Sequence, residues 1–243
     1  MFFNLFWGDW TILVMIPAMI FALVAQARVK STFEKYDRVG TARRISGAEA
    51  ARRILDRNGL YHVRVERVSG RLTDHFDPRE NVIRLSDATY GSNSVAALGV
   101  AAHEAGHAVQ HATGYLPIKL RAAIIPVTQL GSRLSMPIFL LGFLLSAFAF
   151  VDPYTGGVIM SVGIGLFSLV ALFQLVTLPT EFNASSRALK TLEESGLLYG
   201  NEIGGARRVL SAAAMTYVAA LASSLASILR LVILAAGASN RRR

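Results

Sequence analysis

Four stretches of the chain carry no charged residue over about the thickness of a bilayer core, and they constrain the fold more than any other feature. They run from Trp10 to Ala27, from Leu134 to Val151, from Pro153 to Thr180 and from Ser211 to Leu229. An apolar stretch of this length predicts a transmembrane helix. We therefore expect a mainly α-helical integral membrane protein in which the first three stretches span the bilayer.

The fourth stretch is open to three interpretations. It is rich in alanine and serine, and Arg230 interrupts it before it continues to Ala236. Such a segment can span the bilayer, lie in its interface or pack on the rest of the protein. A complete fourth crossing would place the C-terminal arginines, 241–243, outside, in conflict with the positive-inside rule.

Composition narrows the class of protein. Hydrophobic residues make up 53% of the chain and charged residues 17%, which is too apolar for an ordinary soluble domain. The chain has no cysteine, which excludes a disulfide framework and leaves His, Asp and Glu as metal ligands. The net charge of +9 falls in blocks between the apolar stretches, a pattern typical of membrane topology, so we expect no nucleic-acid binding.

The distribution of charge predicts the orientation. Residues 28–134 contain 17 Lys and Arg against 10 Asp and Glu, a net charge of +7, whereas the turn between the second and third spans carries only Asp152. The positive-inside rule places residues 28–134 in the cytoplasm and the Asp152 turn outside. The third span then returns the chain to the cytoplasm near Pro179.

The first apolar stretch resembles a signal peptide at its end, where Ala25-Gln26-Ala27 has the small residues of a cleavage site. A signal peptide begins with a basic region. Here the charged side chain before Trp10 is the acidic Asp9, and the basic residues follow the stretch instead. We therefore interpret it as an anchor with its N-terminus outside.

The cytoplasmic part begins with a short α+β pattern. Ser46 and Glu49 have capping-box spacing, and Asn58-Gly59 predicts the end of that helix. Alternation predicts a strand from Tyr61 to Val68, and a second short strand fits Asn81 to Leu85. The Asp- and Pro-containing segment between them, residues 72–78, indicates a loop or turn.

The next helix carries the chemistry. Ser94 to Ala112 is rich in alanine, lacks proline and ends at Thr113-Gly114. It contains His103-Glu104-Ala105-Gly106-His107, an HExxH motif. Histidines four residues apart lie one turn above each other, about 6 Å along the axis, and can bind one zinc ion. Glu104 then occupies the position of the general base.

A catalytic zinc takes three protein ligands and a water, so a third ligand is required. His111 lies eight residues from His103, about 12 Å along the helix, too far to join both histidines on one ion. His75, in the predicted loop, is an alternative. Glu181 follows the third span, in a predicted helix from Glu181 to Ser195 with Thr180 as N-cap and Gly196 as stop. Periodicity alone does not decide between ligation by Glu181 and a role at the helix dipole.

Several segments together resemble the YugP-type family of neutral zinc membrane metallopeptidases. They are the runs at residues 72–78, 101–110, 177–188 and 215–220, so the resemblance covers nearly the whole chain. More distantly the chain is similar to the gluzincin membrane peptidases, in which the glutamate of an ExxAD pattern completes the zinc site. Glu181 and Ala184 match that pattern, but Ser185 stands where those relatives have aspartate. The resemblance implies that Glu181 is the third zinc ligand.

We therefore expect a zinc-dependent membrane metalloendopeptidase. Zinc would be held by His103, His107 and Glu181, and Glu104 would take a proton from the attacking water and pass it to the leaving amine. The oxyanion stabiliser is undecided among His75, Tyr90, Tyr217 and Arg187.

Two other functions compete with the peptidase. A membrane scaffold with a structural zinc would need a fourth protein ligand and would give Glu104 no role. A transporter or channel is disfavoured because no ionisable residue lies within the second or third span. The segment from Asn81 to Leu85 can be read either as an edge strand that binds extended substrate or as a plain structural strand.

The expected organisation has five parts. Residues 1–27 form a transmembrane helix, 28–133 a cytoplasmic zincin-like domain, 134–180 a transmembrane hairpin, 181–210 a cytoplasmic helix with the third ligand, and 211–243 a hydrophobic helix with a basic tail. We expect a prokaryotic cytoplasmic membrane, with the active site on the cytoplasmic side. The partners would be a polypeptide substrate and the lipid bilayer. A regulatory membrane partner or a second copy of the chain is left open.

The orientation can be tested with topology reporters. We predict that a reporter inserted at residue 60 reports cytoplasm and that one at the Asp152 turn reports the opposite side, because the basic residues flank one end of each span. Reporters on the same side of the membrane would contradict the assignment of spans.

Overall fold

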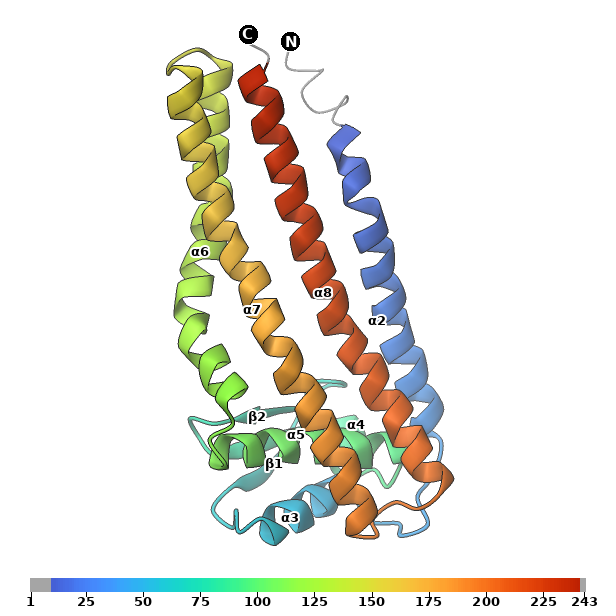
Figure 1. The fold of residues 1–243 in the computed structure, drawn as a ribbon. Helices are drawn as coiled ribbons and strands as arrows, with labels where there is room; N and C mark the ends of the chain where they lie inside the picture. Colours follow the sequence, from blue (N-terminus) through green and yellow to red (C-terminus); the bar gives the residue numbers. More distant parts are fainter. Residues whose placement is uncertain (1–9, 241–243) are drawn as a thin grey trace. The chain divides into compact units, whose positions relative to one another are not determined.

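The computed structural model describes residues 10–240, so Asp9 and the tail at 241–243, which entered the orientation argument, lie outside the described residues. The described chain is mainly helical with one small sheet (Figure 1). In chain order its elements are the 3-10 helix η1 (Trp10–Val14), α2 (Ile16–Asp37), α3 (Gly47–Arg57), β1 (Arg64–Val68), β2 (His75–Asp77), β3 (Val82–Ser86), α4 (Asp87–Tyr90), α5 (Val95–Ala112), α6 (Leu116–Ala147), α7 (Pro153–Glu194) and α8 (Asn201–Asn240).

Contacts between residues divide the chain into two compact units. The helical unit consists of Arg121–Val176 together with the described residues up to Val24 and from Tyr217 onward. The mixed unit consists of Ala25–Leu120 and Thr177–Thr216, and it contains the sheet and α5.

Three helices are long and apolar enough to cross a membrane, judged over the described residues. They are Leu116–Ala147, Pro153–Glu194 and Asn201–Ala238, and they contain most of the second apolar stretch and all of the third and fourth. The fourth stretch is thus part of one continuous helix. The first stretch is not among the three, because α2 soon carries Arg28 and Lys30. That the first stretch crosses the membrane remains a prediction.

Helix α7 corrects one prediction. The sequence predicted a break near Pro179 and a new helix capped by Thr180, but α7 continues without interruption from Pro153 to Glu194. Proline costs one backbone hydrogen bond and a local bend. Ending the helix there would instead expose several backbone groups, so continuity is preferred. At about 1.5 Å per residue, its 42 residues are about twice what a bilayer core requires.

Small residues bring α6 and α7 close together in the helical unit. A Cβ atom on Gly163 would lie 2.7 Å from the backbone nitrogen of Phe139, and one on Gly142 would lie 2.8 Å from that of Met160. Close backbone approach through glycine is typical of packing between membrane helices. The pairing of α6 with α7 therefore depends on these glycines.

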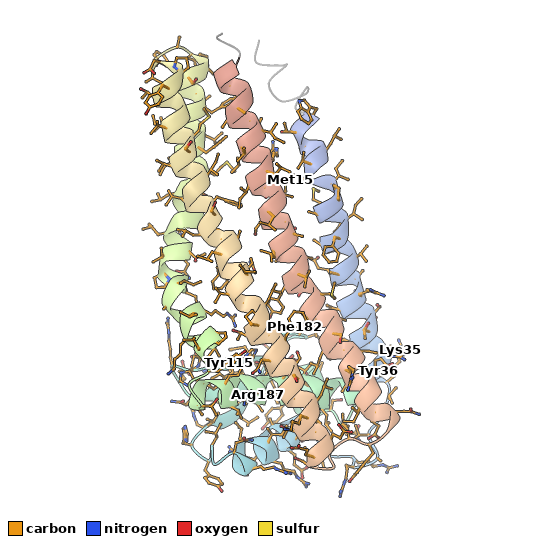
Figure 2. All side chains as sticks on the ribbon, in the orientation of Figure 1. Met15, Lys35, Tyr36, Tyr115, Phe182 and Arg187 are labelled. Carbon is orange, nitrogen blue, oxygen red and sulfur yellow. The ribbon has the colours of Figure 1, made fainter. Side chains whose placement is uncertain are left out.

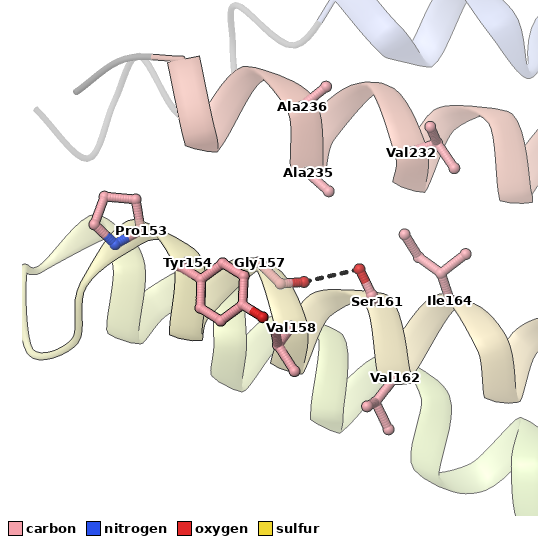
Figure 3. A pocket seen from close by; sticks show the side chains of 10 residues that line it. All are labelled: Pro153, Tyr154, Gly157, Val158, Ser161, Val162, Ile164, Val232, Ala235 and Ala236. Atoms are coloured by element: carbon pink, nitrogen blue, oxygen red, sulfur yellow. Dashed lines mark hydrogen bonds between the residues drawn. The ribbon is translucent and has the colours of Figure 1, made fainter. Parts of the chain in front are cut away.

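The same unit has an open, largely apolar groove of about 860 Å³ between α7 and α8 (Figure 3). Its lining includes Tyr154 and Val158 from α7 and Val232 and Ala235 from α8. The hydroxyl of Ser161 donates to the carbonyl of Gly157, 2.9 Å away, so this polar group is satisfied within its own helix.

The mixed unit has a three-stranded sheet in the order β1-β3-β2. β1 is parallel to β3, with Val65 opposite Ile83, and β2 is antiparallel to β3, with Phe76 also opposite Ile83. Two interpretations were wrong. The segment at 72–78 is not loop throughout, because β2 forms in it, and β3 is the central strand and not an edge strand. The first strand begins at Arg64 and not at Tyr61.

The predicted helix boundaries around the sheet are confirmed. The side chains of Ser46 and Ser94 accept hydrogen bonds from the backbone nitrogens of Glu49 and Ala97, which fixes the starts of α3 and α5. A core of buried apolar residues joins α3, β3 and α5 to the C-terminal part of α7 and the N-terminal part of α8. Its members include Leu55, Leu85, Leu98, Leu192 and Ala206. This core holds α5 against α7.

Candidate metal centre

Helix α5 is buried along most of its length because its residues are small. Ala101, Ala102 and Ala105 have no exposed surface, and Ala108 is almost fully buried. The histidines His103 and His107 lie one turn apart, with ring centroids 4.7 Å from each other and ring planes at 84°. Both imidazoles therefore reach the same space.

Helix α7 approaches α5 closely at Gly106, within the HExxH motif. A Cβ atom there would lie 2.9 Å from the carbonyl oxygen of Ala184 and 3.4 Å from its Cα. Only a residue without a side chain fits against a backbone at that distance. Glu181 lies three residues before Ala184, so the contact brings its carboxylate to the two histidines.

The three side chains converge on one point. Oε2 of Glu181 lies 3.3 Å from Nε2 of His103 and 3.5 Å from Nε2 of His107. The ligand atoms of all three residues lie within 4.8 Å of one another, and Glu181 is only 2% exposed. The separations exceed the usual 2.7–3.2 Å range of a hydrogen bond. They match the edge of a tetrahedron of about 3.4 Å, which zinc bonds of about 2.0–2.1 Å would give.

The second nitrogen of His107 is occupied. Nδ1 of His107 lies 3.0 Å from Oε1 of Gln110, and Nε2 of Gln110 donates to the carbonyl of Thr180 and to Oδ1 of Asn183. Oδ1 of Asn183 also accepts a 2.7 Å hydrogen bond from Nε of Arg187.

This chain of hydrogen bonds determines the tautomer of His107. Arginine can only donate, so Asn183 must present its oxygen, and Gln110 must then turn its nitrogen to Asn183 and its oxygen to His107. Nδ1 of His107 therefore donates, and its Nε2 keeps a lone pair that faces Glu181. Orientation of a metal-binding histidine through its other nitrogen is usual in zinc sites.

Ser185 contacts the second nitrogen of His103, as Gln110 contacts that of His107. Its hydroxyl lies 3.2 Å from Nδ1 of His103 and can accept a hydrogen bond from it. Serine in place of the aspartate of the ExxAD pattern thus keeps a hydrogen-bonding group here but brings no charge. A neutral partner makes His103 a weaker electron donor than a carboxylate would.

Glu104 is 8% exposed and lies next to His103 on α5. Burial lowers the pKa of His107, but the nearby Glu181 carboxylate, the negative charge of Glu104 and the contact with Gln110 outweigh it, so the pKa is raised. The negative charge of Glu104 therefore acts within the same site as Glu181.

The other two predicted ligand candidates lie away from this cluster. His75 is exposed on β2, where its Nδ1 lies 2.9 Å from the carbonyl of Thr73. His111 is exposed near the end of α5 and packs edge-on against Phe76, with centroids 6.0 Å apart. Neither belongs to the three-residue group formed by the described part of the chain.

The candidates for oxyanion stabilisation are also distinguished by position. The guanidinium of Arg187 lies over the ring of Tyr115, 5.9 Å from its centroid (Figure 2 labels both residues). Its Nε donates to Asn183, so it supports the hydrogen-bond chain to His107. Tyr90 packs against the core, and Tyr217 belongs to the helical unit. Sequence reasoning missed the part played by Gln110, although its spacing of three residues from His107 places both on one face of the helix.

Similarity to known proteins points to one family. A family model described as "Putative neutral zinc metallopeptidase" matches residues 11–236. The chain belongs to this family. It is 47% identical over 223 residues to the "Putative membrane protease YugP" of Bacillus subtilis (strain 168), which covers 92% of this chain and 95% of that protein. No solved structure matches the chain.

The family name implies zinc, and the donor set fits it, because two imidazoles and one carboxylate form a common catalytic zinc site. Both imidazoles present Nε2 while their Nδ1 atoms are engaged by Gln110 and Ser185. The residues present therefore fit the zinc ion that the family name implies.

The close approach at Gly106 predicts the effect of a single methyl group. Gly106→Ala should lower the thermal midpoint in detergent and weaken zinc binding, because the added Cβ must push α7 away, at a cost of about 1–3 kcal/mol. Gly99→Ala on the same helix is the control, since its Cβ would lie 3.5 Å from that of Ala206, an ordinary contact. If Gly106→Ala matched the control in both measurements, the contact would not determine the site.

The identity of the third ligand is tested by zinc affinity, measured by competition with a chromogenic chelator. We predict that Glu181→Ala lowers the affinity more than about 100-fold, beyond the range of about 10- to 100-fold for residues that only orient ligands. His75→Ala and His111→Ala, both exposed, should change it less than about 10-fold. Loss of zinc in His75→Ala with wild-type affinity in Glu181→Ala would make the strand histidine the ligand.

Proposed function

We propose that the chain is a zinc-dependent membrane metalloendopeptidase in which His103, His107 and Glu181 hold zinc and Glu104 is the general base. The observation that carries the proposal is the convergence of the buried Glu181 carboxylate on the Nε2 atoms of both HExxH histidines. Membership of the neutral zinc metallopeptidase family and the name of the Bacillus relative support it.

The chemistry divides between the metal and the chain. Zinc bound there would polarise the scissile carbonyl and lower the pKa of a coordinated water to about 7. The Glu104 carboxylate would take up a proton as the water oxygen bonds to the carbonyl carbon, and would deliver it to the amine as the C–N bond breaks. Its burial keeps bulk water from competing for that proton.

The remaining residues of the site hold its geometry. Gln110 keeps Nδ1 of His107 protonated, and Ser185 contacts Nδ1 of His103, so both Nε2 atoms stay directed at Glu181. Preorganisation of this kind avoids rearrangement during the reaction. The site is thus arranged before substrate arrives.

A scaffold with a structural zinc is the competing function. Structural zinc sites are closed by four protein ligands, whereas catalytic sites keep one position open. Within residues 10–240 the cluster contains three His or carboxylate residues. The buried Glu104 beside them has a role in hydrolysis and none in a closed structural site, which favours the enzyme.

For substrate and location, we propose a polypeptide that reaches the site on the cytoplasmic side of a prokaryotic membrane. The excess of basic residues in 28–134 supports this side, and three apolar helices support association with lipid. Since β3 is central, the edge open to an extended peptide near α5 is that of β2, where Phe76 contacts His111.

The experiment that tests the proposal separates metal binding from proton transfer. The wild type should bind one zinc per chain, cleave casein and lose that activity on chelation. Glu104→Gln should keep the zinc and lose about 100- to 10,000-fold in hydrolysis, because an amide cannot accept the proton. His62→Gln, a change at an exposed histidine outside the three-residue cluster, is the control and should keep both properties. Unchanged turnover in Glu104→Gln would remove Glu104 from the mechanism.

A further inference from the structure

A pocket lined by several cations lies in the mixed unit, between the C-terminal part of α2 and the N-terminal part of α8. Its volume is about 420 Å³, and four of its lining residues are cations: Arg28 and Lys35 from α2, and Arg207 and Arg208 from α8. None of these four residues belongs to the candidate metal centre. The pocket therefore presents a concentration of positive charge that the proposed hydrolysis does not use.

These cations are not neutralised by carboxylates. Arg208 donates to the hydroxyl of Tyr36 at 3.2 Å, and Lys35 lies 5.6 Å from the centre of the same ring (Figure 2 labels both α2 residues). Among the described residues, no ion pair joins any of the four to Asp or Glu. Four like charges gathered without counterions repel one another, so an anion bound between them is favoured.

Two acidic groups on the same helices are committed elsewhere, and a third, Glu34 on α2, does not line the pocket. Asp37 on α2 accepts from Ser94 and pairs with Arg71, and Glu202 on α8 accepts from the backbone nitrogens of Ala42 and Tyr199. Thr32 and Ser211, which carry neutral hydroxyls, also line the pocket. This combination of guanidinium, ammonium and hydroxyl donors is suited to phosphate oxygens.

The position of the cations along their helices identifies the source of the phosphate. Arg28 directly follows the first apolar stretch, and Arg207 and Arg208 lie within one helical turn before the fourth. One turn before Arg28 on α2, Leu23 and Val24 are exposed by 64% and 51%. On both helices the charged pocket thus adjoins sequence suited to acyl chains, as the headgroup level of a bilayer requires.

We propose that this pocket binds the phosphodiester headgroup of an anionic phospholipid, held by Arg28, Lys35, Arg207 and Arg208. A zwitterionic headgroup brings its own cation next to these four and binds less well. The bound lipid links the start of α8 to the end of α2. The site is independent of the proposed peptidase activity, since it shares no residue with it.

The test measures lipid binding to the delipidated, full-length protein in neutral detergent by native mass spectrometry. Phosphatidylglycerol should bind saturably with one lipid per chain, and phosphatidylcholine should bind at least about tenfold more weakly. Arg207→Gln with Arg208→Gln should weaken phosphatidylglycerol binding about 30-fold, from the contribution of two cations near a membrane surface. Added salt should weaken wild-type binding, because the pocket is exposed.

The matched control removes the same charge outside the pocket. Lys30→Gln with Arg38→Gln alters two exposed cations of α2 that do not line it, and should change the affinity less than about threefold. If the first pair disturbs folding by loss of the Arg208 bond to Tyr36, Arg28→Gln with Lys35→Gln replaces it and should give the same loss.

Three results would overturn the proposal. Equal losses in the pocket pair and the control pair would reduce the effect to net charge. Equal affinity for phosphatidylglycerol and phosphatidylcholine would remove selectivity for an anionic headgroup. Complete displacement of phosphatidylglycerol by an equal concentration of inorganic phosphate would assign the pocket to a free anion.

Discussion

The backbone contact between Gly106 of α5 and Ala184 of α7 is the constraint on which the candidate metal centre depends. Its 2.9 Å approach, measured to a Cβ that glycine lacks, leaves no room for any side chain. Gly106 lies between the two histidines of the motif in sequence, and Glu181 lies about one turn before Ala184 on α7. A carboxylate almost eighty residues away in sequence is thereby placed within 3.5 Å of both imidazoles.

Burial explains why this geometry is kept. Helix α5 consists largely of small, buried residues, and the core joins it to α3, α7 and α8. The helices therefore cannot separate without exposing apolar surface. A carboxylate held in such an interior is costly unless a cation or hydrogen-bond donors compensate its charge. The hydrogen-bond chain from Arg187 through Asn183 and Gln110 to His107 adds a second constraint, since it permits a single tautomer.

Helix α7 combines two demands that usually fall on separate elements. Its first part is apolar enough to cross a membrane, and its last part carries Glu181, Asn183, Ser185 and Arg187. A helix of about twice the bilayer thickness can meet both demands because its hydrogen bonds are internal throughout. The proline at 179 is tolerated within it, and the ligand position follows the span directly.

The sequence by itself determined the apolar helices, the capped ends of α3 and α5, and the HExxH pair, because each depends on local spacing. It predicted Glu181 only through resemblance to a family. Tertiary structure decided the rest: β2 formed within an expected loop because β3 offered it a partner, and β3 became central for the same reason. The continuity of α7 past Pro179, the part of Gln110 and the exclusion of His75 from the cluster all depend on contacts between distant segments. No local pattern encodes such contacts, since they arise only when the helices pack.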